Sequence, residues 1–433
     1  MNQSFLTGAA TAAHQVEGNN RNSDNWVMEH LPHTTFVEPS GDAVDHYHRY
    51  ESDIQMLADA GCNAYRFSIE WARIEPQEGL YDEKEIAHYR DVIDCCAKNH
   101  ITPIVTLHHF SSPAWLMGKG GWASPYVADA FARYTENLLT ALQRELPYIC
   151  TINEANMGFQ IQKVVEDMQK AMQKEGSIQV GLNTGASSIE LFMGEQAAAF
   201  GCAKDQLFPF LAARTQQQEV FVMQAHQKAC AAVRKVLPQA KVGLTLSLFD
   251  YQPTPTGEDQ ARRLWEEDFG FYLPFIRTDD FLGVQNYSRK IVTQNGAEAP
   301  APDAPLTQMG YEDYPASIGH VLRKVAQEFP GELLVTENGI ATQDDARRCQ
   351  FIREAYTAVR DCARDGLPVT GYCYWSLLDN FEWQAGFGKT FGMIAVDRIT
   401  QIRTPKDSLR VLGELAKKGY SPHHGRLSRL VDA

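Results

Sequence analysis

The sequence has 433 residues, of which 44% are hydrophobic and 22% charged, as in a globular protein with a large core. The 54 acidic residues outnumber the 40 Lys and Arg residues, so the formal charge is −14. This balance argues against nucleic acid or an anionic membrane as the main partner, because both require a surplus of basic residues. The length allows three average domains or one large α/β barrel with insertions.

The cysteines and the N-terminal residues indicate a cytoplasmic protein. None of the nine cysteines forms a C-x-x-C pair, so we expect reduced thiols. No basic segment precedes the apolar residues of MNQSFLTGAATAAHQVEGNN, and we therefore predict no signal peptide. Charged residues interrupt the most apolar stretch, residues 188–213, which is too polar to cross a membrane.

Eight short segments are apolar or alternating, end in polar residues, and are predicted to be strands. They are residues 5–12, 63–69, 102–109, 148–154, 241–248, 281–287, 333–338 and 369–378. Six longer segments between them have helical periodicity and good helix formers. They are residues 45–61, 82–100, 124–146, 219–236, 316–329 and 344–366.

Strands that alternate with helices in this way predict an α/β protein with a (β/α)8 TIM-barrel fold. No Pro-, Gly- or Ser-rich linker divides the chain, so we expect residues 1–433 to form a single catalytic domain. Two stretches, approximately 158–214 and 293–314, do not fit the alternation. The first contains polar helical sequence without a strand, and the second is rich in Pro and Ala. Both are predicted to be elaborated loops that follow strands.

In a parallel barrel the chemistry gathers at the carboxyl ends of the strands. Polar and aromatic residues stand at these ends: Gln15, Glu17, Arg66, His108, His109, Asn153, Glu154, Tyr287, Glu337, Asn338 and Trp375. Glu154 and Glu337 end the fourth and seventh strands, and such strands face each other across the barrel mouth. Paired carboxyl groups of this kind can cleave a glycosidic bond.

Two carboxylates in one pocket do not both ionise at low cost, so one of them keeps its proton near neutral pH. Arg66 and Tyr287 are the candidates for holding Glu337 in its ionised form. The other residues at the rim suit a sugar. Indole rings can pack on the apolar face of a pyranose, and amide, imidazole and carboxyl groups can bind its hydroxyls. The indole rings are those of Trp375 and Trp383. The groups that can bind hydroxyls belong to Gln15, His109, Asn153 and Glu382.

Histidines near the strand ends raise the alternative of a metal site. His108 and His109 are adjacent on a strand and should point to opposite faces, so no metal site is expected. His46 and His48 lie in a predicted helix, where packing is the expected role. The same alternation separates Asn153 from Glu154, and both can serve one site only if the strand ends or bulges there.

The residues at the strand ends lie in segments that resemble glycoside hydrolase family 1, the β-glucosidase family. The segments follow the family's order over nearly the whole chain. They are FLTGAATAAHQVEG, NAYRFSIEWARIEP, TLHHFSSPAWL, TINEANM, GVQNYSR, VTENGIA and YWSLLDNFEW with GFGKTFGMIAVD. Any one of these motifs alone would be weak evidence for the family, whereas the whole set in this order is highly specific for it.

The resemblance implies a (β/α)8 barrel that retains configuration through a covalent glycosyl-enzyme. It implies that Glu154 is the general acid/base, that Glu337 is the nucleophile, and that Arg66 and Tyr287 support the nucleophile. The family's sugar-binding positions correspond to Gln15, His109, Asn153, Trp375, Glu382 and Trp383, with Phe391 near the 6-hydroxyl. A cis peptide bond is expected between Trp375 and Ser376. No metal or cofactor is implied.

Three positions depart from the family pattern. Ala155 replaces the proline that usually follows the acid/base, which should loosen the backbone there. Gln285 stands where the family usually has Asn, and Asn286 replaces a tyrosine, so specificity is affected rather than mechanism. Relatives that hydrolyse 6-phosphosugars usually have Ser at position 382, and Glu382 would repel a phosphate.

The leading hypothesis is an exo-acting, retaining β-glycosidase of the β-glucosidase type that hydrolyses unphosphorylated small-molecule β-glycosides. Its carboxyl groups should lie about 5–5.5 Å apart. The alternatives are a 6-phospho-β-glycosidase and a non-catalytic barrel that binds glycosides or proteins. The sequence leaves open the glycone, the balance of hydrolysis and transglycosylation, and the oligomeric state. The loops 158–214 and 293–314 are expected to shape the aglycone side.

Overall fold

The computed structural model of the protein describes residues 5–174 and 184–418. Its centre is a parallel sheet in the order β5-β4-β3-β2-β1-β12-β11-β8-β6. The strands are β1 (Leu6–Ala10), β2 (Ala64–Ser68), β3 (Thr102–His108), β4 (Tyr148–Ile152), β5 (Lys241–Gly243), β6 (Thr245–Ser247), β8 (Phe281–Gln285), β11 (Glu332–Asn338) and β12 (Val369–Trp375). All eight predicted strands are therefore present, the fifth as two short segments.

The sheet closes into a barrel through the fifth predicted strand. Its first half, β5, pairs with β4, and its second half, β6, pairs with β8. The Gly283 N–H also donates to the Leu244 carbonyl between the two halves. The predicted (β/α)8 barrel is confirmed, and the carboxyl ends of its strands meet at one mouth.

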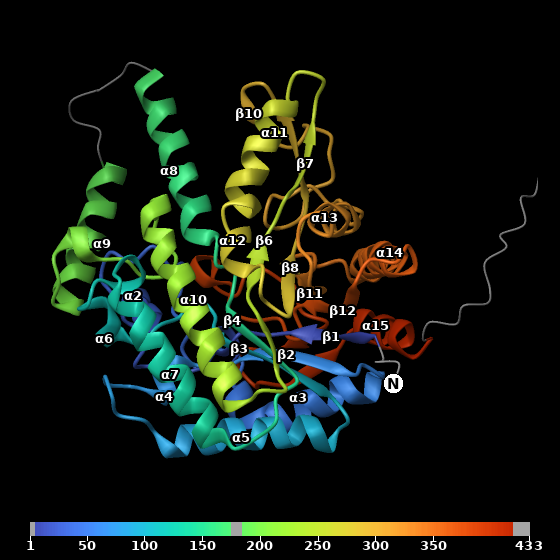
Figure 1. Ribbon diagram of the computed structural model, residues 1–433, viewed down its shortest axis with the longest axis horizontal. Coiled ribbons are helices and arrows are strands. Elements are labelled where there is room, and N and C mark those ends of the chain that lie inside the picture. The colour runs from blue at the N-terminus through green and yellow to red at the C-terminus, as the bar shows by residue number, and fades with distance from the viewer. Residues whose placement is uncertain (1–4, 175–183, 419–433) are drawn as a thin grey trace, which may run out of the picture.

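Helices surround the barrel (Figure 1) and bury one face against its strands. The six predicted helices are α3 (His46–Ala60), α5 (Glu83–Lys98), α7 (Tyr126–Leu142), α10 (Gln216–Val236), α13 (Ser317–Val325) and α14 (Asp345–Arg364). Asp82 and Asp344 cap the N-termini of α5 and α14 by accepting hydrogen bonds from backbone N–H groups. Gly61 ends α3 in the left-handed region.

Shorter elements occupy the connections. The helices there are α1 (Ala13–Val16), α2 (Asp24–Glu29), α4 (Trp71–Ile74), α6 (Ala114–Met117), α11 (Glu258–Trp265) and α12 (Leu273–Ile276). The last described helix, α15 (Asp407–Lys417), packs against α14, α3 and β1. Two small sheets are built from β7 (Asp250–Pro253), β9 (Arg289–Thr293) and β10 (Gly296–Ala297), and from β13 (Ile394–Val396) and β14 (Arg403–Pro405).

The stretch 158–214 is more ordered than a loop. It contains most of α8 (Met157–Lys174) and all of α9 (Thr184–Phe200), while residues 175–183 lie outside the described part. The helices α8 and α11 stand above the barrel mouth in Figure 1. The stretch 293–314 contains β10 and then runs irregularly toward α13.

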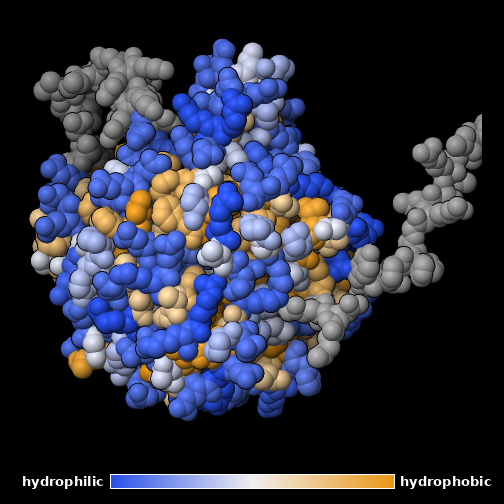
Figure 2. Space-filling model, in the orientation of Figure 1, coloured by the Kyte–Doolittle hydropathy of each residue, from blue (hydrophilic) through white to orange (hydrophobic). Residues whose placement is uncertain are grey.

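The core lies inside the barrel and between the barrel and its helices. β1, β2, β4 and β8 are buried along their whole length, as expected for strands covered on both faces. Hydrophilic residues cover most of the face in Figure 2, with apolar residues in patches across its middle. All nine cysteines are free thiols. No described helix combines the length and apolar character needed to cross a membrane.

Candidate active site

Glu154 and Glu337 line one cavity of about 360 Å³ at the carboxyl ends of the barrel strands. The other lining residues are Gln15, His109, Phe110, Met157, Gln160, Leu211, Ser247, Leu248, Phe249, Tyr287, Met309, Tyr311, Trp375, Glu382, Trp383, Gln384, Ala385 and Phe391. Residues from both ends of the chain therefore meet at the barrel mouth, where the sequence places the chemistry. The volume is typical of a small-molecule site.

The backbone at the end of β4 explains how neighbouring residues reach the same site. The strand ends at Ile152, and Glu154 has a φ of 42°, in the left-handed region. Its N–H donates to the Thr245 hydroxyl at 2.8 Å, and the next N–H, of Ala155, donates to the Thr245 carbonyl at 3.0 Å. The expected break in strand alternation is confirmed. Ala155 supplies a hydrogen bond that a proline cannot make, and this bond restrains the backbone at the position where loosening is expected.

A local irregularity in β11 directs Glu337 into the cavity. The pairing of β11 with β8 shifts register between Val335 and Glu337, which is a β-bulge. Bulges reorient side chains at the rims of barrels. Glu337 is buried and accepts hydrogen bonds from three different side chains.

These three donors hold both oxygens of Glu337. Arg66 donates to Oε1 at 2.5 Å, and the amide of Gln285 donates to the same oxygen at 3.0 Å. The Tyr287 hydroxyl donates to Oε2 at 2.6 Å. Arg66 is 0% exposed and also donates to Oδ1 of Asn153 at 2.6 Å. The predicted placement of Arg66 and Tyr287 beside Glu337 thus agrees with the geometry.

The two carboxyl groups have different electrostatic surroundings. Burial and the charge of Glu337 raise the pKa of Glu154 to about 8. Burial also raises the pKa of Glu337, but the Arg66 charge and the hydrogen bonds from Tyr287, Arg66 and Gln285 oppose that rise. A guanidinium contacts Glu337 directly, so the proton of the pair belongs on Glu154.

Two polar groups of the cavity lack protein partners. The His109 Nε2 faces the Asn153 amide nitrogen at 3.1 Å and must accept, so Nδ1 carries the proton. Nδ1 of His109 and Oε1 of Gln15 are buried without a hydrogen-bond partner in the described part of the chain. Burial lowers the pKa of His109 well below its usual value, so the ring is neutral. One donor and one acceptor are thus free for ligand hydroxyls.

The remaining predicted sugar contacts are also brought together. Trp375 and Trp383 line the cavity, and their rings stack against His109 with centroids 5.7 and 6.3 Å apart. The Trp375–Ser376 peptide bond is cis, as expected. Glu382 contacts Gln15 Nε2 at 3.4 Å, and burial together with the Glu337 charge raises its pKa to about 8. Phe391 lines the cavity as well.

Several strand-end residues lie outside the cavity lining. Arg66 and Asn153 are not among the lining residues, but Arg66 donates to Glu337 and the Asn153 amide contacts His109. Glu17 accepts from Arg73, and Asn338 accepts from Tyr372. His108 points away from His109 and packs on Trp122, with ring centroids 4.4 Å apart, as strand alternation predicts. His46 bonds Asp53 inside the protein, as expected of a packing residue, whereas His48 is exposed and bonds Asp45.

Sequence reasoning missed a second set of contacts. Gln285 bonds Glu337, Asn153 and Thr245 through one amide nitrogen, whereas the sequence shows only that this residue departs from the family pattern. Thr245 and Ser247 are two residues apart on the predicted fifth strand, and this alternation is the signal that could have revealed them. Met309 and Tyr311 come from the stretch 293–314 that was expected to shape the aglycone side.

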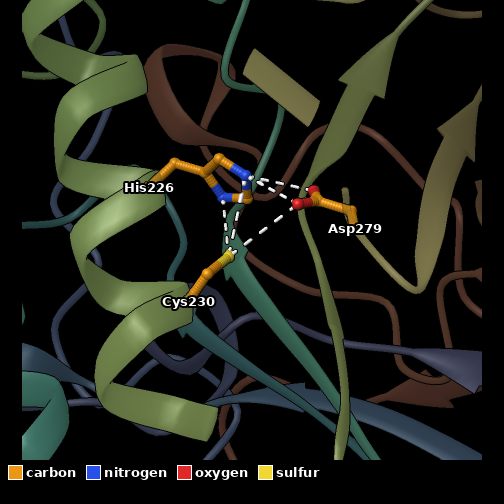
Figure 3. A group of neighbouring side chains, drawn as sticks. All are labelled: His226, Cys230 and Asp279. Atoms are coloured by element: carbon orange, nitrogen blue, oxygen red, sulfur yellow. Dashed lines mark hydrogen bonds and ion pairs between the residues drawn. The ribbon is translucent and has the colours of Figure 1, made fainter. Parts of the chain in front are cut away.

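A buried group of His226, Cys230 and Asp279 has the residue types of a metal site (Figure 3). Both ring nitrogens of its histidine already have partners within the protein. Nδ1 of His226 bonds the Thr151 hydroxyl at 2.7 Å, and Nε2 pairs with Asp279 at 3.0 Å. Burial opposes the imidazolium, but the Asp279 carboxylate and the Cys230 sulfur outweigh it and raise the pKa of His226 to about 10. This is the pattern of a buried ion pair that joins α10 to the segment before β8.

A larger hollow of about 750 Å³ lies between residues 305–316 and α14 and shares no lining residue with the active-site cavity. Three charged residues line it, and Arg347 pairs with both Asp313 and Glu354. The carboxylate pair therefore marks the smaller cavity as the site of chemistry.

Comparison with known proteins decides the family. Residues 1–176 and 275–420 match the model of glycosyl hydrolase family 1. The chain belongs to this family. As expected, it is a glycoside hydrolase, and the predicted retaining β-glycosidase function is confirmed at the level of the family.

Relatives of this family 1 enzyme match nearly its whole length. β-Glucosidase A of Thermotoga maritima is 29% identical over 94% of this chain and 95% of its own length. A 6-phospho-β-galactosidase of Clostridium acetobutylicum is 26% identical over 93% of this chain and 94% of its own. The crystal structure of β-glycosidase BGL167 is 39% identical with a TM-score of 0.88, covering 98% of this chain and all of that one.

Proposed function

We propose that the enzyme removes a terminal β-glucosyl or related unphosphorylated residue from small β-glycosides, with Glu337 as nucleophile and Glu154 as general acid/base. The observation that carries this proposal is the asymmetry of the carboxyl pair. Glu337 accepts hydrogen bonds from Arg66, Tyr287 and Gln285, whereas the pKa of Glu154 is raised to about 8. An ionised and a protonated carboxyl group are what double displacement requires.

In the first step an oxygen of Glu337 attacks the anomeric carbon, and the bond from that carbon to the leaving oxygen breaks. Glu154 gives its proton to the leaving oxygen, so the aglycone departs as a neutral alcohol. The sugar is then held by an ester bond to Glu337. Arg66 and Tyr287 remain beside the carboxyl group and keep it oriented.

Forming the ester removes the negative charge of Glu337, which is one cause of the raised pKa of Glu154. The pKa of Glu154 therefore falls in the intermediate, and the group becomes a base that accepts a proton from water. The water oxygen attacks the anomeric carbon and the ester bond to Glu337 breaks. Two inversions at one carbon leave its configuration unchanged.

The glycone is assigned to the end of the cavity near Gln15, His109, Glu382 and Trp383. The free donor of His109 and the free acceptor of Gln15 suit sugar hydroxyls, and the indole of Trp375 offers a flat apolar face. Asn153 is expected to serve the 2-hydroxyl, where a hydrogen bond that strengthens in the transition state contributes several kcal/mol.

The test is turnover of 4-nitrophenyl β-D-glucoside by Glu154→Gln and Glu337→Gln variants, with the exposed Glu51→Gln on α3 as matched control. Both site variants should lose at least about 10³-fold in kcat, and the control should be unchanged. Azide should restore turnover of Glu154→Ala with a β-glucosyl azide product, and of Glu337→Ala with the α-anomer. Near-normal rates in both Gln variants would refute the assignment.

A further inference from the structure

A side cavity of about 170 Å³ adjoins the active-site cavity. The two cavities share Phe110, Leu211 and Gln384 as lining residues. The rest of the side cavity is formed by Asn25, Met28, Thr35, Phe36, Phe192, Gln196 and Pro209. The two cavities therefore meet at the three shared side chains.

The walls of the side cavity are held by definite contacts. Phe192 and Gln196 lie one turn apart on α9 and present the same face. The neighbouring residue Glu195 accepts from the backbone N–H of His33 at 3.0 Å and pairs with its ring at 2.5 Å, which ties α9 to the segment after α2. On the opposite wall, Phe36 stacks in parallel on Phe381 with centroids 6.2 Å apart.

The lining indicates the chemistry of an occupant. Three phenylalanines, Phe36, Phe110 and Phe192, provide aromatic surface, and none of the lining residues carries a charge. Gln196 is only 5% exposed, yet its side chain forms no hydrogen bond with any described residue. The amide is therefore available to a hydrogen-bonding group of a ligand in the cavity.

One part of the lining of the side cavity comes from the stretch of the chain that the family match leaves out. The match omits residues 177–274, and this stretch supplies Phe192, Gln196, Pro209 and Leu211. Four of the ten lining residues of the side cavity therefore lie outside the matched segments, and the other six lie within them.

We propose that the side cavity binds the aglycone, and that the preferred aglycone is an uncharged fused aromatic ring system with a hydroxyl group on its outer ring. The outer ring packs among the three phenylalanines, and its hydroxyl bonds the Gln196 amide. A disaccharide would leave most of its hydroxyls unpaired against this surface. The proposal rests on the proposed β-glycosidase function.

The experiment compares kcat/KM for phenyl, 2-naphthyl and 6-hydroxy-2-naphthyl β-D-glucosides, whose leaving phenols have similar acidity. The enzyme should prefer the naphthyl over the phenyl glucoside by about tenfold. Thr35→Trp fills the cavity from its exposed rim, and Phe192→Ala removes one wall. Both should abolish the naphthyl preference, and circular dichroism spectra that match the parent enzyme report correct folding.

Two further variants sharpen the comparison. Val37→Trp adds the same indole at an exposed neighbouring position outside the cavity and should keep the naphthyl preference. The parent enzyme should have a kcat/KM for the 6-hydroxy-2-naphthyl glucoside about fivefold or more above that for the 2-naphthyl glucoside. Gln196→Met should remove this difference and keep the preference for naphthyl over phenyl. The proposal fails if the parent enzyme shows no naphthyl preference, or if that preference survives in both Thr35→Trp and Phe192→Ala. Absence of turnover on every glucoside would instead refute the proposed function.

Discussion

The side-chain amide of Gln285 donates a 3.0 Å hydrogen bond to Oε1 of Glu337. Its nitrogen also contacts Asn153 at 2.7 Å and Thr245 at 3.0 Å, so one amide links the candidate nucleophile to the end of β4 and to β6. Residue 285 is the position where the family usually has Asn. The longer side chain of this enzyme is therefore part of the support of Glu337.

Replacing Gln285 by Leu should lower kcat/KM on 4-nitrophenyl β-D-glucoside by about 10–100-fold, because Glu337 and Asn153 lose a donor inside the barrel. The Gln285 hydrogen bond helps to lower the pKa of Glu337. Its loss should raise that pKa and move the acidic limb of the pH–rate profile to higher pH. Gln285→Asn, which keeps a donor, should lose less activity. An unmoved acidic limb in Gln285→Leu would argue against this positioning role.

Activity should fall as pH rises through about 8. Burial and the Glu337 charge raise the pKa of Glu154 to about 8, and a general acid works only in its protonated form. The pH dependence of kcat/KM on a phenyl glucoside reports this ionisation. Glu382 also has a pKa of about 8, so Glu382→Gln serves as the control and should keep the alkaline limb. The assignment to Glu154 is wrong if Glu382→Gln removes that limb.

Discrimination against 6-phosphosugars should depend on Glu382. Its partly buried carboxyl lies at the proposed glycone end, and Lys389 already donates to the Gln308 carbonyl at 2.7 Å. The ratio of kcat/KM for cellobiose to that for its 6-phosphate should increase as pH rises through about 8, since Glu382 then becomes charged. Glu382→Ser should lower the ratio by at least about tenfold, and Glu51→Gln should not change it. A parent enzyme that favours the phosphorylated sugar would overturn this prediction.

Ala155→Pro should destabilise the enzyme although the family usually has proline there. The substitution removes the N–H that donates to the Thr245 carbonyl at 3.0 Å. Loss of a buried hydrogen bond costs about 1–3 kcal/mol of unfolding free energy, measurable by chemical denaturation. Ala155→Ser keeps the N–H and should lose less. Equal stability of the parent and the proline variant would show that this hydrogen bond contributes nothing.

Much of the fold and part of the site are readable from the sequence. Buried parallel strands are short apolar segments that lie between longer segments with helical periodicity. This difference in pattern locates all eight barrel strands in the sequence. Because parallel strands meet at one end of the barrel, Glu154 and Glu337 are brought together by strand order alone. Arg66, His109 and Trp375 follow by the same reasoning.

The contacts that hold the site residues in position cannot be predicted from the sequence in this way. Gln285 reaches Glu337 through a side chain one methylene longer than the family's usual residue, and Glu154 depends on a left-handed backbone turn. The side cavity combines Phe36 with Phe192 and Gln196, which are far apart in the chain and belong to no motif. Strand order does not specify how such side chains pack.

The sequence by itself determined the barrel and the facing carboxyl groups, because both depend on local periodicity and on which residue ends each strand. Only the tertiary structure decided which carboxyl group keeps the proton and which shape the aglycone side has. Those properties depend on burial and on contacts of a few ångströms between residues distant in sequence, such as Arg66 with Glu337.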